Sequence, residues 1–542
     1  MAEPVKPDGG HPAPGRGLVR STGIISALIF LSRVLGLVRE QVFATLLGAG
    51  LYADAFQAAF RIPNLLRDLF AEGALSAAFV PTYARALREG GPERAYRLAN
   101  RLMTLLVTVL GALVVVAFIF AGPLVRTLAP GFERVPGKIA ITVQLTRVML
   151  PFLPLVSFAA VAMGMLNAHQ RYATPAFAPA VFNLVTIAWA AVLWAAGFSP
   201  AQVALGWAAG TLLGGAAQFG IQLPGLWKAG WRFRPEWGPS DPDLRAILSL
   251  MAPATVGLAA VQVNIFVGTN FASAEEGAVA WLSYAFRILY LPIGIFGVAV
   301  GTVATTGLAL RAAAGDMEGV RDTVRRALRF LCYLTLPATA GLMALGVPVV
   351  RLLFERGKFH AGDTQSTAAA LMLYSTGLVA YTGVKVLAPA FYALGRPRVP
   401  LLASASAVAT NILVILTLHA RLGFRAIALG TALGSIMNAA VLIAVFQSRV
   451  GGIVRELFSS AIARMVVAAA VMAPAAWYIA RVLEEWVGTQ GLRAQLLTGL
   501  VPVALGGAIY LVLTALFRVR EAADLLGLVG RLLGRLRRGQ KL

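Results

Sequence analysis

Long apolar runs dominate the pattern of this 542-residue chain. A helix needs about 20 apolar residues to cross the hydrocarbon core of a bilayer, and fourteen runs reach that length. They cover residues 22–47, 54–82, 102–121, 139–166, 176–197, 201–224, 246–272, 278–309, 330–350, 367–393, 400–419, 423–446, 461–482 and 495–516. None alternates with period 2, and a backbone in lipid must satisfy its hydrogen bonds within its own segment. The pattern therefore predicts an all-α polytopic membrane protein with fourteen transmembrane helices.

The first twelve runs contain an internal repeat. The motif AFRI stands at residues 59–62 and again at 285–288, 226 residues later. Asn183 and Asn411, which each interrupt an apolar run, are 228 residues apart, and two further motifs recur at nearly the same offset. An offset of six runs preserves the orientation of a helix in the membrane. The repeat therefore predicts two parallel six-helix lobes with a cavity between them near the midplane, an architecture typical of transporters.

The predicted organisation follows from the runs and the repeat. It consists of a disordered cytoplasmic tail (1–20), an N-lobe (21–226), an interlobe cytoplasmic linker (227–245), a C-lobe (246–446), an appended helix pair (461–516) and a basic amphipathic cytoplasmic tail (518–542). The linker carries three tryptophans and three prolines, which predicts an interfacial segment. In the last tail, leucine clusters alternate with Arg531, Arg535, Arg537 and Arg538. This spacing suits a helix on the inner leaflet, and a solvated helix is the alternative.

Composition and charge refine this picture. Hydrophobic residues make up 58% of the chain, charged residues 13%, and the mean hydropathy is +0.76, values typical of a membrane protein. The net charge is +23. With Arg425, Arg464 and Arg481 at the ends of runs counted in the adjoining loops, 30 of the 47 Lys and Arg residues lie in the tails and even-numbered loops, 10 in the odd-numbered loops and 7 inside the runs. By the positive-inside rule, this asymmetry places both termini in the cytoplasm. Topology and anionic membrane lipids then explain the basic excess, with no nucleic acid.

Cysteine and histidine usage excludes several site chemistries. The single cysteine, Cys332, rules out an internal disulfide framework and a cysteine-cluster metal site. The four histidines are scattered along the chain, so we expect loop or core roles and no metal site. The apolar run that follows residue 20 is too long for a signal peptide and carries arginines.

Charged residues inside the runs are the strongest functional signal. Arg33, Arg39, Arg67 and Arg287 lie where an arginine costs roughly 2.5 to 3.5 kcal/mol on insertion scales, which sums to about 10 to 14 kcal/mol. Apart from the three arginines at run ends that are counted with the loops, the runs hold seven cations and four acids, namely Arg33, Arg39, Arg61, Arg67, Arg147, Arg287 and Lys385 against Glu40, Asp54, Asp68 and Glu72. Pairing every acid would leave 7 − 4 = 3 cations. We expect Arg147 and Lys385 to be the first to extend toward an interface.

A polar stripe follows the second run. Arg61, Asn64, Asp68 and Glu72 are spaced by 3, 4 and 4 residues, which places them on one helix face about 16 Å long. Arginine presents a planar fork that binds two phosphate oxygens at once. We therefore expect the stripe and the arginines to line a cavity for an anionic, phosphorylated substrate. A purely structural charge network is the alternative.

An enzymatic site has weaker support. General acid–base chemistry needs paired carboxylates or histidines in a pocket. The only Asp-x-Asp motif, Asp241 and Asp243, stands in a proline-rich loop, where a turn is the expected role. A cation-exporting drug pump would need a cavity of the opposite charge. No catalytic residue is therefore predicted.

Four motifs carry a family resemblance. SRVLGLVRE, DAFQAAFRIPNLLRDLFAEGALSAAFVPTYA, NAHQRYATPAFAPAVFNL and KVLAPAFYALGRPRVP are similar to segments of the MurJ (MviN) family, within the multidrug/oligosaccharidyl-lipid/polysaccharide (MOP) exporter superfamily. The likeness extends over residues 21–517 and fits a fourteen-helix MOP-type transporter fold. It implies a bacterial inner-membrane flippase for lipid II, the undecaprenyl-pyrophosphate-linked disaccharide-pentapeptide precursor of peptidoglycan.

The resemblance also implies roles for particular residues. By motif, pyrophosphate binding falls on four cavity arginines, and supporting roles fall on three further residues: Arg33, Arg39, Arg67 and Arg287, then Ser32, Asp54 and Glu72. The helix pair at 461–516 is implied to form a groove for the polyprenyl tail. Some members resemble sodium-coupled transporters with acids in the seventh, eleventh and twelfth runs. Here 246–272 and 400–446 contain no Asp or Glu, so we expect no carboxylate sodium site.

The combined hypothesis is a lipid II flippase rather than an enzyme. It needs no cofactor, works by alternating access in the bacterial cytoplasmic membrane, and has the membrane potential as a plausible drive. The expected partners are lipid II, anionic lipids and the cell-wall synthesis machinery. The alternatives are an exporter of another polyprenyl-linked glycan, a MATE-like transporter and, from another class, a membrane enzyme acting on polyprenyl phosphates.

Overall fold

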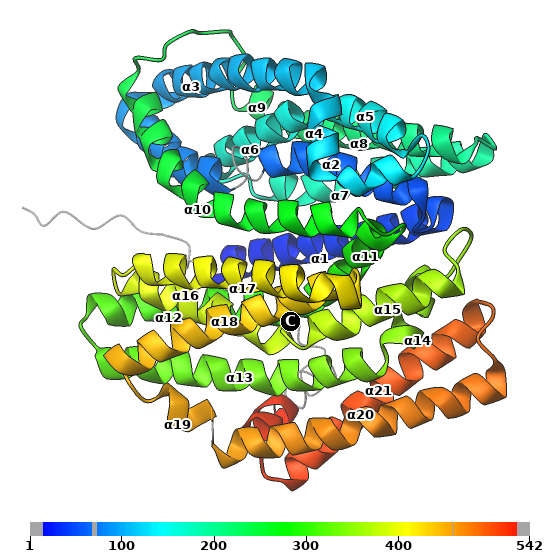
Figure 1. Ribbon diagram of the computed structural model, residues 1–542. Coiled ribbons are helices and arrows are strands. Elements are labelled where there is room, and N and C mark those ends of the chain that lie inside the picture. Colours follow the sequence, from blue (N-terminus) through cyan, green and yellow to red (C-terminus); the bar gives the residue numbers. More distant parts are fainter. Residues whose placement is uncertain (1–14, 68–72, 458, 528–542) are drawn as a thin grey trace, which may run out of the picture. The chain divides into compact units, whose positions relative to one another are not determined.

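The computed structural model describes residues 15–67, 73–457 and 459–527, and these residues form helices joined by turns, with no strand (Figure 1). In chain order the elements are α1 (Gly15–Leu47), α2 (Leu51–Arg67), α3 (Gly73–Ile119), α4 (Ala121–Leu128), η2 (Pro130–Arg134), α5 (Lys138–Met149), α6 (Phe152–Ala168), α7 (Ala173–Ala195), α8 (Pro200–Gly220), α9 (Leu223–Lys228), α10 (Pro242–Ala272), α11 (Ala278–Pro292), η3 (Ile293–Gly297), α12 (Val298–Ala313), α13 (Met317–Ala344), α14 (Gly346–Phe354), α15 (Ala361–Ser375), α16 (Leu378–Ala393), α17 (Arg398–Leu422), α18 (Arg425–Arg449), α19 (Ile453–Leu457), α20 (Ser460–Val487) and α21 (Leu492–Leu516). A C-terminal helical segment follows at residues 520–527.

As far as its residues are described, each of the fourteen predicted runs lies mainly in helix. Among the described residues, nine helices are long and apolar enough to cross a membrane, and a bent pair raises this number to ten. Some of the others are too short for that criterion, such as α2 with its 17 described residues. The all-helical membrane architecture is therefore confirmed, and the total of fourteen spans stays a prediction.

Several runs are interrupted for identifiable local reasons. Pro151 separates α5 from α6 inside one predicted run, because a proline in a helix interior removes a hydrogen bond and clashes with the preceding turn. The run at 278–309 passes through a π-helical turn, η3, directly after Pro292. α15 and α16 meet at a bend of 44° beside Gly377. Gly91 breaks α3 with a φ of 71°, a left-handed conformation that glycine adopts readily.

The chain ends differ from the prediction where they are described. α1 begins at Gly15, inside the predicted tail, because Pro14 is the last proline before Pro63 and nothing prevents helix formation after it. Residues 1–14 and 528–542 lie outside the described residues, so the disorder of the first tail and the amphipathic helix of the last stay predictions. Asp68 and Glu72 also lie outside them.

The chain divides into two compact units. The first contains the residues up to Val42, Ile62–Ile119 and Thr146–Thr255, and the second contains Phe43–Arg61, Phe120–Leu145 and the residues from Val256 on. The division cuts through α1, α2, α5 and α10, so it follows packing and not the sequence repeat. The predicted lobes and linker were defined by the repeat, and they stay predictions.

Each unit has its own apolar cores. In the first unit, buried side chains of α3 and α6 enclose Trp231 of the linker. In the second unit, α12, α13, α16, α17 and α18 share one core, and α13, α20 and α21 share another. Figure 1 shows α20 and α21 side by side, and α20 packs along α13. The appended helix pair is therefore built onto α13.

Candidate functional site

Two of the four predicted cavity arginines lie on α1. Arg33 is exposed, and within the described part of the chain it makes no hydrogen bond or ion pair. Arg39 has 18% of its side chain exposed, and its Nη2 donates to Oε1 of Glu40 at 2.7 Å. The guanidinium of Arg39 also lies 5.1 Å from the ring centroid of Phe182 on α7. Glu40 therefore offsets part of the charge on this helix, and Arg33 remains available to a ligand.

Asn183 fixes α7 against α1. Its Nδ2 donates to the carbonyl oxygen of Ser32 at 3.1 Å. Gly36 lies beside this contact, and a Cβ at that position would be in ordinary van der Waals contact with the same Nδ2 at 3.5 Å. The contact uses the backbone of Ser32, so a supporting role for its hydroxyl stays a prediction.

Asp54 on α2 is fully buried. Its Oδ2 accepts from Nζ of Lys138 at 2.8 Å and from the N–H of Gly277 at 2.7 Å, and its Oδ1 accepts from the N–H of Ala280 at 2.9 Å. A carboxylate in this place caps the first turn of α11 and interacts favourably with the helix dipole. Lys138 is 1% exposed and lies 4.3 Å from the ring centroid of Phe132. Asp54 is therefore held by protein partners and is not available to offset a cavity arginine.

Further contacts of the second unit surround this ion pair. Tyr284 on α11 donates its hydroxyl to the carbonyl of Gly48 at 2.8 Å, and the N–H of Lys358 donates to the carbonyl of Thr45 at 3.0 Å. Gly48 has a φ of 66°, and a Cβ there would lie 2.4 Å from the carbonyl oxygen of Lys358. We call this group the latch; its members are Thr45, Gly48, Asp54, Lys138, Gly277, Tyr284 and Lys358. The latch joins residues of the predicted N-lobe to residues of the predicted C-lobe within one compact unit.

The polar stripe of α2 is partly described. Arg61 and Asn64 lie on α2, which continues through Pro63 and is described to Arg67. All three polar side chains are partly buried. The predicted helical spacing from Arg61 to Asn64 is confirmed. The continuation of the stripe to Asp68 and Glu72 falls outside the described residues and stays a prediction.

An aromatic cluster surrounds the position before Arg287. The ring centroid of Phe286 lies 5.5 Å from that of Tyr374 and 6.4 Å from that of Tyr381. Tyr374 lies on α15 and Arg61 on α2, both in the second unit. Arg287 itself is exposed on α11. This part of the second unit therefore combines arginines with tyrosine hydroxyls, a set of donors that suits an anionic ligand.

Arg147 and Lys385, the cations expected to extend toward an interface, differ in their surroundings. The Nε of Arg147 donates to the carbonyl of Phe118 at 3.2 Å, and its guanidinium lies 5.1 Å from the Phe118 ring centroid. Phe118 stands at the C-terminal end of α3, where the last carbonyls lack partners within the helix. Lys385 is exposed. Arg147 therefore has its hydrogen-bond partner at the end of α3, and no substrate contact is required to explain its position.

The predicted site residues divide between the two units. Ser32, Arg33, Arg39, Asn64 and Arg67 belong to the first unit, and Asp54, Arg61 and Arg287 belong to the second. Neither unit alone contains all four cavity arginines. Their joint role in pyrophosphate binding therefore stays a proposal.

The polar residues of the seventh, eleventh and twelfth runs are uncharged. Asn411 on α17 is 2% exposed, and its Nδ2 donates to Oδ1 of Asn264 on α10. Gly430 on α18 packs against the Oδ1 of Asn411, which has no hydrogen-bond partner among the described residues. A sodium ion away from water needs oxygen ligands and a nearby negative charge to offset its desolvation. These residues include no carboxylate, so they do not fit a carboxylate sodium site.

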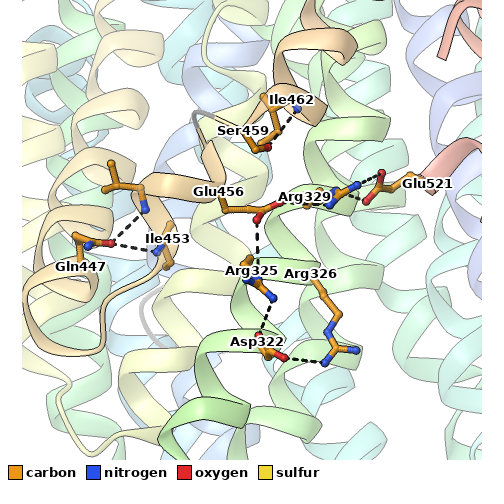
Figure 2. A network of polar contacts seen from close by, with 11 residues as sticks. Asp322, Arg325, Arg326, Arg329, Gln447, Ile453, Glu456, Ser459, Ile462 and Glu521 are labelled. Atoms are coloured by element: carbon orange, nitrogen blue, oxygen red, sulfur yellow. Dashed lines mark hydrogen bonds and ion pairs between the residues drawn. The ribbon is translucent and has the colours of Figure 1, made fainter. Parts of the chain in front are cut away.

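A second charged network lies at the start of α13 (Figure 2). Arg329 forms ion pairs with Glu456 of α19 at 3.5 Å and with Glu521 of the C-terminal helical segment at 2.5 Å. Nearby, Arg325 pairs with Asp322 at 2.9 Å. The network lines a pocket of about 600 Å³ that holds four arginines and four acids. Because these charges cancel, the pocket is not a second anion site.

Arg351 on α14 makes a similar contact to the appended pair. Its Nη1 lies 2.5 Å from Oε1 of Glu484 on α20, and its Nε lies 3.7 Å from Oε2 of Glu355. Arg356 donates to Oε1 of Gln495 on α21 at 3.2 Å. Charged contacts therefore fasten α20 and α21 to the rest of the second unit, in addition to their apolar core.

Spacing along the chain does not indicate these partners. Lys138 pairs with an acid 84 residues away, Arg351 with one 133 residues away, and Arg329 with one 192 residues away. Spacing rules detect pairs within a few turns of one helix. Such distant partners emerge only when the helices are packed.

Comparison with known proteins finds relatives over most of the chain. Residues 43–495 match a family model described as "Lipid II flippase MurJ". A Rhizobium meliloti protein named "Probable lipid II flippase MurJ" is 36% identical over 503 residues, which is 91% of this chain and 92% of the relative. A Vibrio cholerae protein of the same name is 35% identical over 516 residues, covering 93% of this chain and 97% of the relative. A Burkholderia cenocepacia protein named "Lipid II flippase MurJ" is 36% identical over 388 residues, covering 71% and 75%.

The fold also recurs in solved structures. A structure described as "Lipid II flippase MurJ, inward closed conformation" matches with a TM-score of 0.75 and 23% identity, covering 93% of this chain and 99% of that one. An inward-facing multidrug resistance MATE transporter of the MOP superfamily matches with a TM-score of 0.65 and 17% identity, covering 79% and 95%. These likenesses confirm the predicted MOP-type fold.

Proposed function

We propose, from the premise that this chain belongs to the MurJ family of lipid II flippases, that it moves lipid II from the inner to the outer leaflet of the bacterial cytoplasmic membrane. The observation that carries the proposal is the match to relatives named as lipid II flippases along more than nine tenths of both chains. The multi-pass helical fold supports it, because the polar head group of the substrate must be carried through hydrocarbon.

The four cavity arginines are the proposed ligands of the pyrophosphate. Two of the four acids in the predicted runs already have partners, since Glu40 pairs with Arg39 and Asp54 pairs with Lys138. The cations of these runs outnumber the acids, which favours an anionic substrate over a cationic one. Each guanidinium can donate two parallel hydrogen bonds to phosphate oxygens, which offsets the desolvation of the pyrophosphate.

The latch is the proposed closure on the outer side. Its residues lie in or beside the odd-numbered predicted loops, which the positive-inside rule places outside the cytoplasm. While the latch is closed, the substrate site can be open only toward the cytoplasm. Release on the outer side then requires Asp54 to leave the first turn of α11. The substrate must bind with similar free energy in both states, because a strongly preferred state would retain it.

The membrane potential is the proposed drive. Moving one elementary charge across the membrane is worth roughly 2.3 kcal/mol per 100 mV. The pyrophosphate is negatively charged, so a potential that is negative inside favours its outward movement. The uncharged contact between Asn264 and Asn411 gives no basis for sodium coupling.

The appended pair α20–α21 is the proposed support for the polyprenyl tail. Both helices expose large apolar side chains, among them Val466, Val471, Val503 and Val512. Moving a chain of about 55 carbons into a polar cavity would cost much free energy, because each CH₂ gains roughly 0.8 kcal/mol from an apolar environment. The tail would therefore stay in the membrane beside the pair while the head group crosses. Anionic lipids and the cell-wall synthesis machinery are further proposed partners, with both termini in the cytoplasm.

Complementation tests the proposal. In a strain depleted of its lipid II flippase, the wild-type chain should restore growth, whereas Arg39→Ala and Arg287→Ala should not, because each loses a charge-assisted phosphate contact. The double variant Arg39→Ala with Glu40→Gln separates that loss from the effect of a stranded carboxylate. Arg396→Ala, at an exposed loop position, is the matched control and should behave as wild type. Immunoblots of membrane fractions verify that every variant is inserted.

The outcomes distinguish the alternatives. Growth supported by both alanine variants would refute the assigned arginine roles. Failure of the wild-type chain at normal expression would favour an exporter of another polyprenyl-linked glycan. In vesicles, labelled lipid II should appear in the opposite leaflet chemically unchanged, and its conversion to a new product would favour an enzyme.

A further inference from the structure

The linker, residues 227–245, is fastened to α3 in the first unit. Trp231 is 1% exposed, and its Nε1 donates to Oδ1 of Asn100 at 3.0 Å. The N–H of Glu236 donates to Oγ1 of Thr104 at 3.0 Å. These contacts are spaced by one helical turn along α3. The linker therefore packs along this helix and is held to it by hydrogen bonds.

The acidic side chains of the linker are all engaged with α3. Asp241 pairs with Arg101, and Oε2 of Glu236 lies 3.6 Å from Nε of the same arginine. Asp243 pairs with Nη2 of Arg94 at 2.8 Å. Asp241 also accepts the N–H three residues later, at the start of α10, which confirms a structural role for the Asp-x-Asp motif. None of the three acids is among the exposed residues.

The basic side chains of the linker and three of its four aromatic side chains are exposed instead. Three exposed cations, Lys228, Arg232 and Arg234, precede α10, and the exposed fractions of Trp227, Phe233 and Trp237 are 47%, 45% and 65%. The guanidinium of Arg232 lies 5.4 Å from the ring centroid of Trp227. Because the acids are bound to α3, the outer face of the linker carries positive charge interleaved with aromatic rings.

The sequence of α3 indicates the level of this face in the membrane. The contacts to the linker come from residues 94–104 of α3, and the predicted apolar run of this helix begins at residue 102. The linker therefore lies at the boundary between the polar and apolar parts of the helix. Aromatic rings are stabilised at the head-group level of a bilayer, and lysine and arginine are attracted to anionic lipids there.

We propose that the outer face of the linker binds the head groups of anionic phospholipids. Trp227, Phe233 and Trp237 insert at the head-group level, and the three cations contact lipid phosphates. Because Asp241 and Asp243 are bound to α3, the lipid contact also anchors α3 and the start of α10 to the membrane surface. The linker then moves with the first unit, and a change between states must take place in α10 beyond it.

Spin-label accessibility of the full chain in vesicles tests this proposal. Cys332→Ser removes the only native thiol, and Phe233→Cys provides the labelling site. In phosphatidylcholine vesicles that contain phosphatidylglycerol, the label should be accessible to oxygen and protected from a water-soluble nickel chelate. In phosphatidylcholine alone, the protection should be lost. Arg232→Gln with Arg234→Gln should weaken the apparent affinity for phosphatidylglycerol roughly 30-fold, because each basic residue at an anionic surface contributes roughly fivefold.

A second arginine pair provides the matched control. Arg396 and Arg398 have the same Arg-x-Arg spacing beside a proline and are equally classed as exposed. Arg396→Gln with Arg398→Gln should leave the protection of the label unchanged. Equal nickel accessibility with and without phosphatidylglycerol would overturn the proposal, as would the same loss of protection in the control pair. The flippase function can stand in either case, because growth complementation is scored separately.

Discussion

The ion pair of Asp54 and Lys138 is buried, with side-chain exposures of 0% and 1%. Burial costs each charged group several kcal/mol of hydration. Their attraction and the two N–H donors of α11 offset that loss. Removing one member strands the other, so the pair contributes more to the latch than an exposed ion pair would.

Asp54→Asn should destabilise the folded protein by roughly 3 to 5 kcal/mol, because Lys138 becomes an uncompensated buried charge. The measurement is the unfolding temperature of the purified chain in detergent. Adding Lys138→Met should restore much of the loss. Glu133→Gln, which breaks the exposed pair with Arg126, is the control and should change little. Equal destabilisation by the single and double Asp54 variants would contradict the role assigned to the ion pair.

His169, in the loop after α6, makes stability depend on pH. Its Nε2 lies 3.2 Å from the hydroxyl of Tyr83, and burial together with the charge of Arg171 lowers the pKa of His169 below its ordinary value of 6.5. The unfolded chain therefore binds a proton more readily than the folded one. The stabilisation is complete above the unfolded-state pKa and declines as the pH falls through it.

Acidification below pH 6.5 should therefore lower the unfolding temperature of the wild type more than that of His169→Gln. Unfolding curves of the two proteins over a pH series provide the measurement. If the unfolding temperatures of the two proteins fall equally at every pH, the pKa of His169 is the same in the folded and unfolded states.

The sequence predicted the kinds of residue at the site better than their partners. Arg39 and Asp54 stood out as charges in apolar runs, and Glu40 is the direct neighbour of Arg39. The role implied for Asp54 was support of the cavity, whereas the structure places it in the latch with Lys138. Local spacing could not reveal this, because the two residues are 84 positions apart and meet only through packing.

The appended pair α20–α21 is the clearest case at the scale of elements. Arg329 holds α19 and the C-terminal helical segment, while Arg351 holds α20. Between these contacts, Tyr510 of α21 donates its hydroxyl to the carbonyl of Tyr333 at 3.0 Å. The pair is therefore joined to α13 and α14 by polar contacts as well as by apolar packing, and it should move together with them.

Arg329→Ala should loosen the C-terminal helical segment, because Glu456 and Glu521 would lose their shared cation. Limited trypsin digestion should then cleave faster at Arg518 and Arg520. The free-energy cost of undocking should fall by about 1 to 3 kcal/mol, the usual effect of leaving such groups unpaired. Arg326→Ala is the control, since 73% of that side chain is exposed and it pairs only with Asp322 among the described residues. Identical digestion of the two variants would contradict the assigned role of Arg329.

Helix positions were largely predictable from the sequence, and helix breaks were less so. The apolar runs located the described helices because a span in lipid must be long and continuous. Proline and glycine mark the breaks at Pro151 and Gly91. The π-helical turn at η3 could not be predicted, because a proline alone does not determine which hydrogen bonds replace those it removes.

At the scale of the whole molecule, the proposed role of the latch is to close the outer side of the transporter. The N–H of Lys358 donates to the carbonyl oxygen of Thr45 at 3.0 Å, so the two backbones are in contact, and a cysteine at each position tests whether this contact opens. Opening the latch must break this contact. A covalent bond there would therefore prevent the change between states.

Thr45→Cys with Lys358→Cys, in the Cys332→Ser background, should stop lipid II flipping in vesicles after oxidation. Reduction should restore it, and each single cysteine should have no effect under either condition. Undiminished flipping by the oxidised double variant would show that the latch stays closed throughout transport. The assay reports movement of labelled lipid II, so it distinguishes a blocked transporter from an unfolded one once reduction is applied.

The repeat predicted the type of molecule, but it did not predict the compact units. Motifs spaced by 226 residues indicated a two-lobed transporter, and the solved MurJ and MATE folds agree with that class. The packing instead groups residues 43–61 and 120–145 with the second half of the chain. A sequence repeat records how a fold is built, whereas packing also depends on the conformation that the molecule adopts.

The two glycines of the latch region give experimental access to this conformational balance. Gly48 and Gly357 both have positive φ, and a methyl group on Gly357 would lie 2.3 Å from the carbonyl oxygen of Thr45, just as one on Gly48 would meet Lys358. Alanine at either position would clash with the facing backbone and destabilise the closed latch, and no arginine would be altered. The growth of bacteria that carry these alanine variants would show whether cell-wall synthesis depends on how long the protein stays in the state that is closed to the outside.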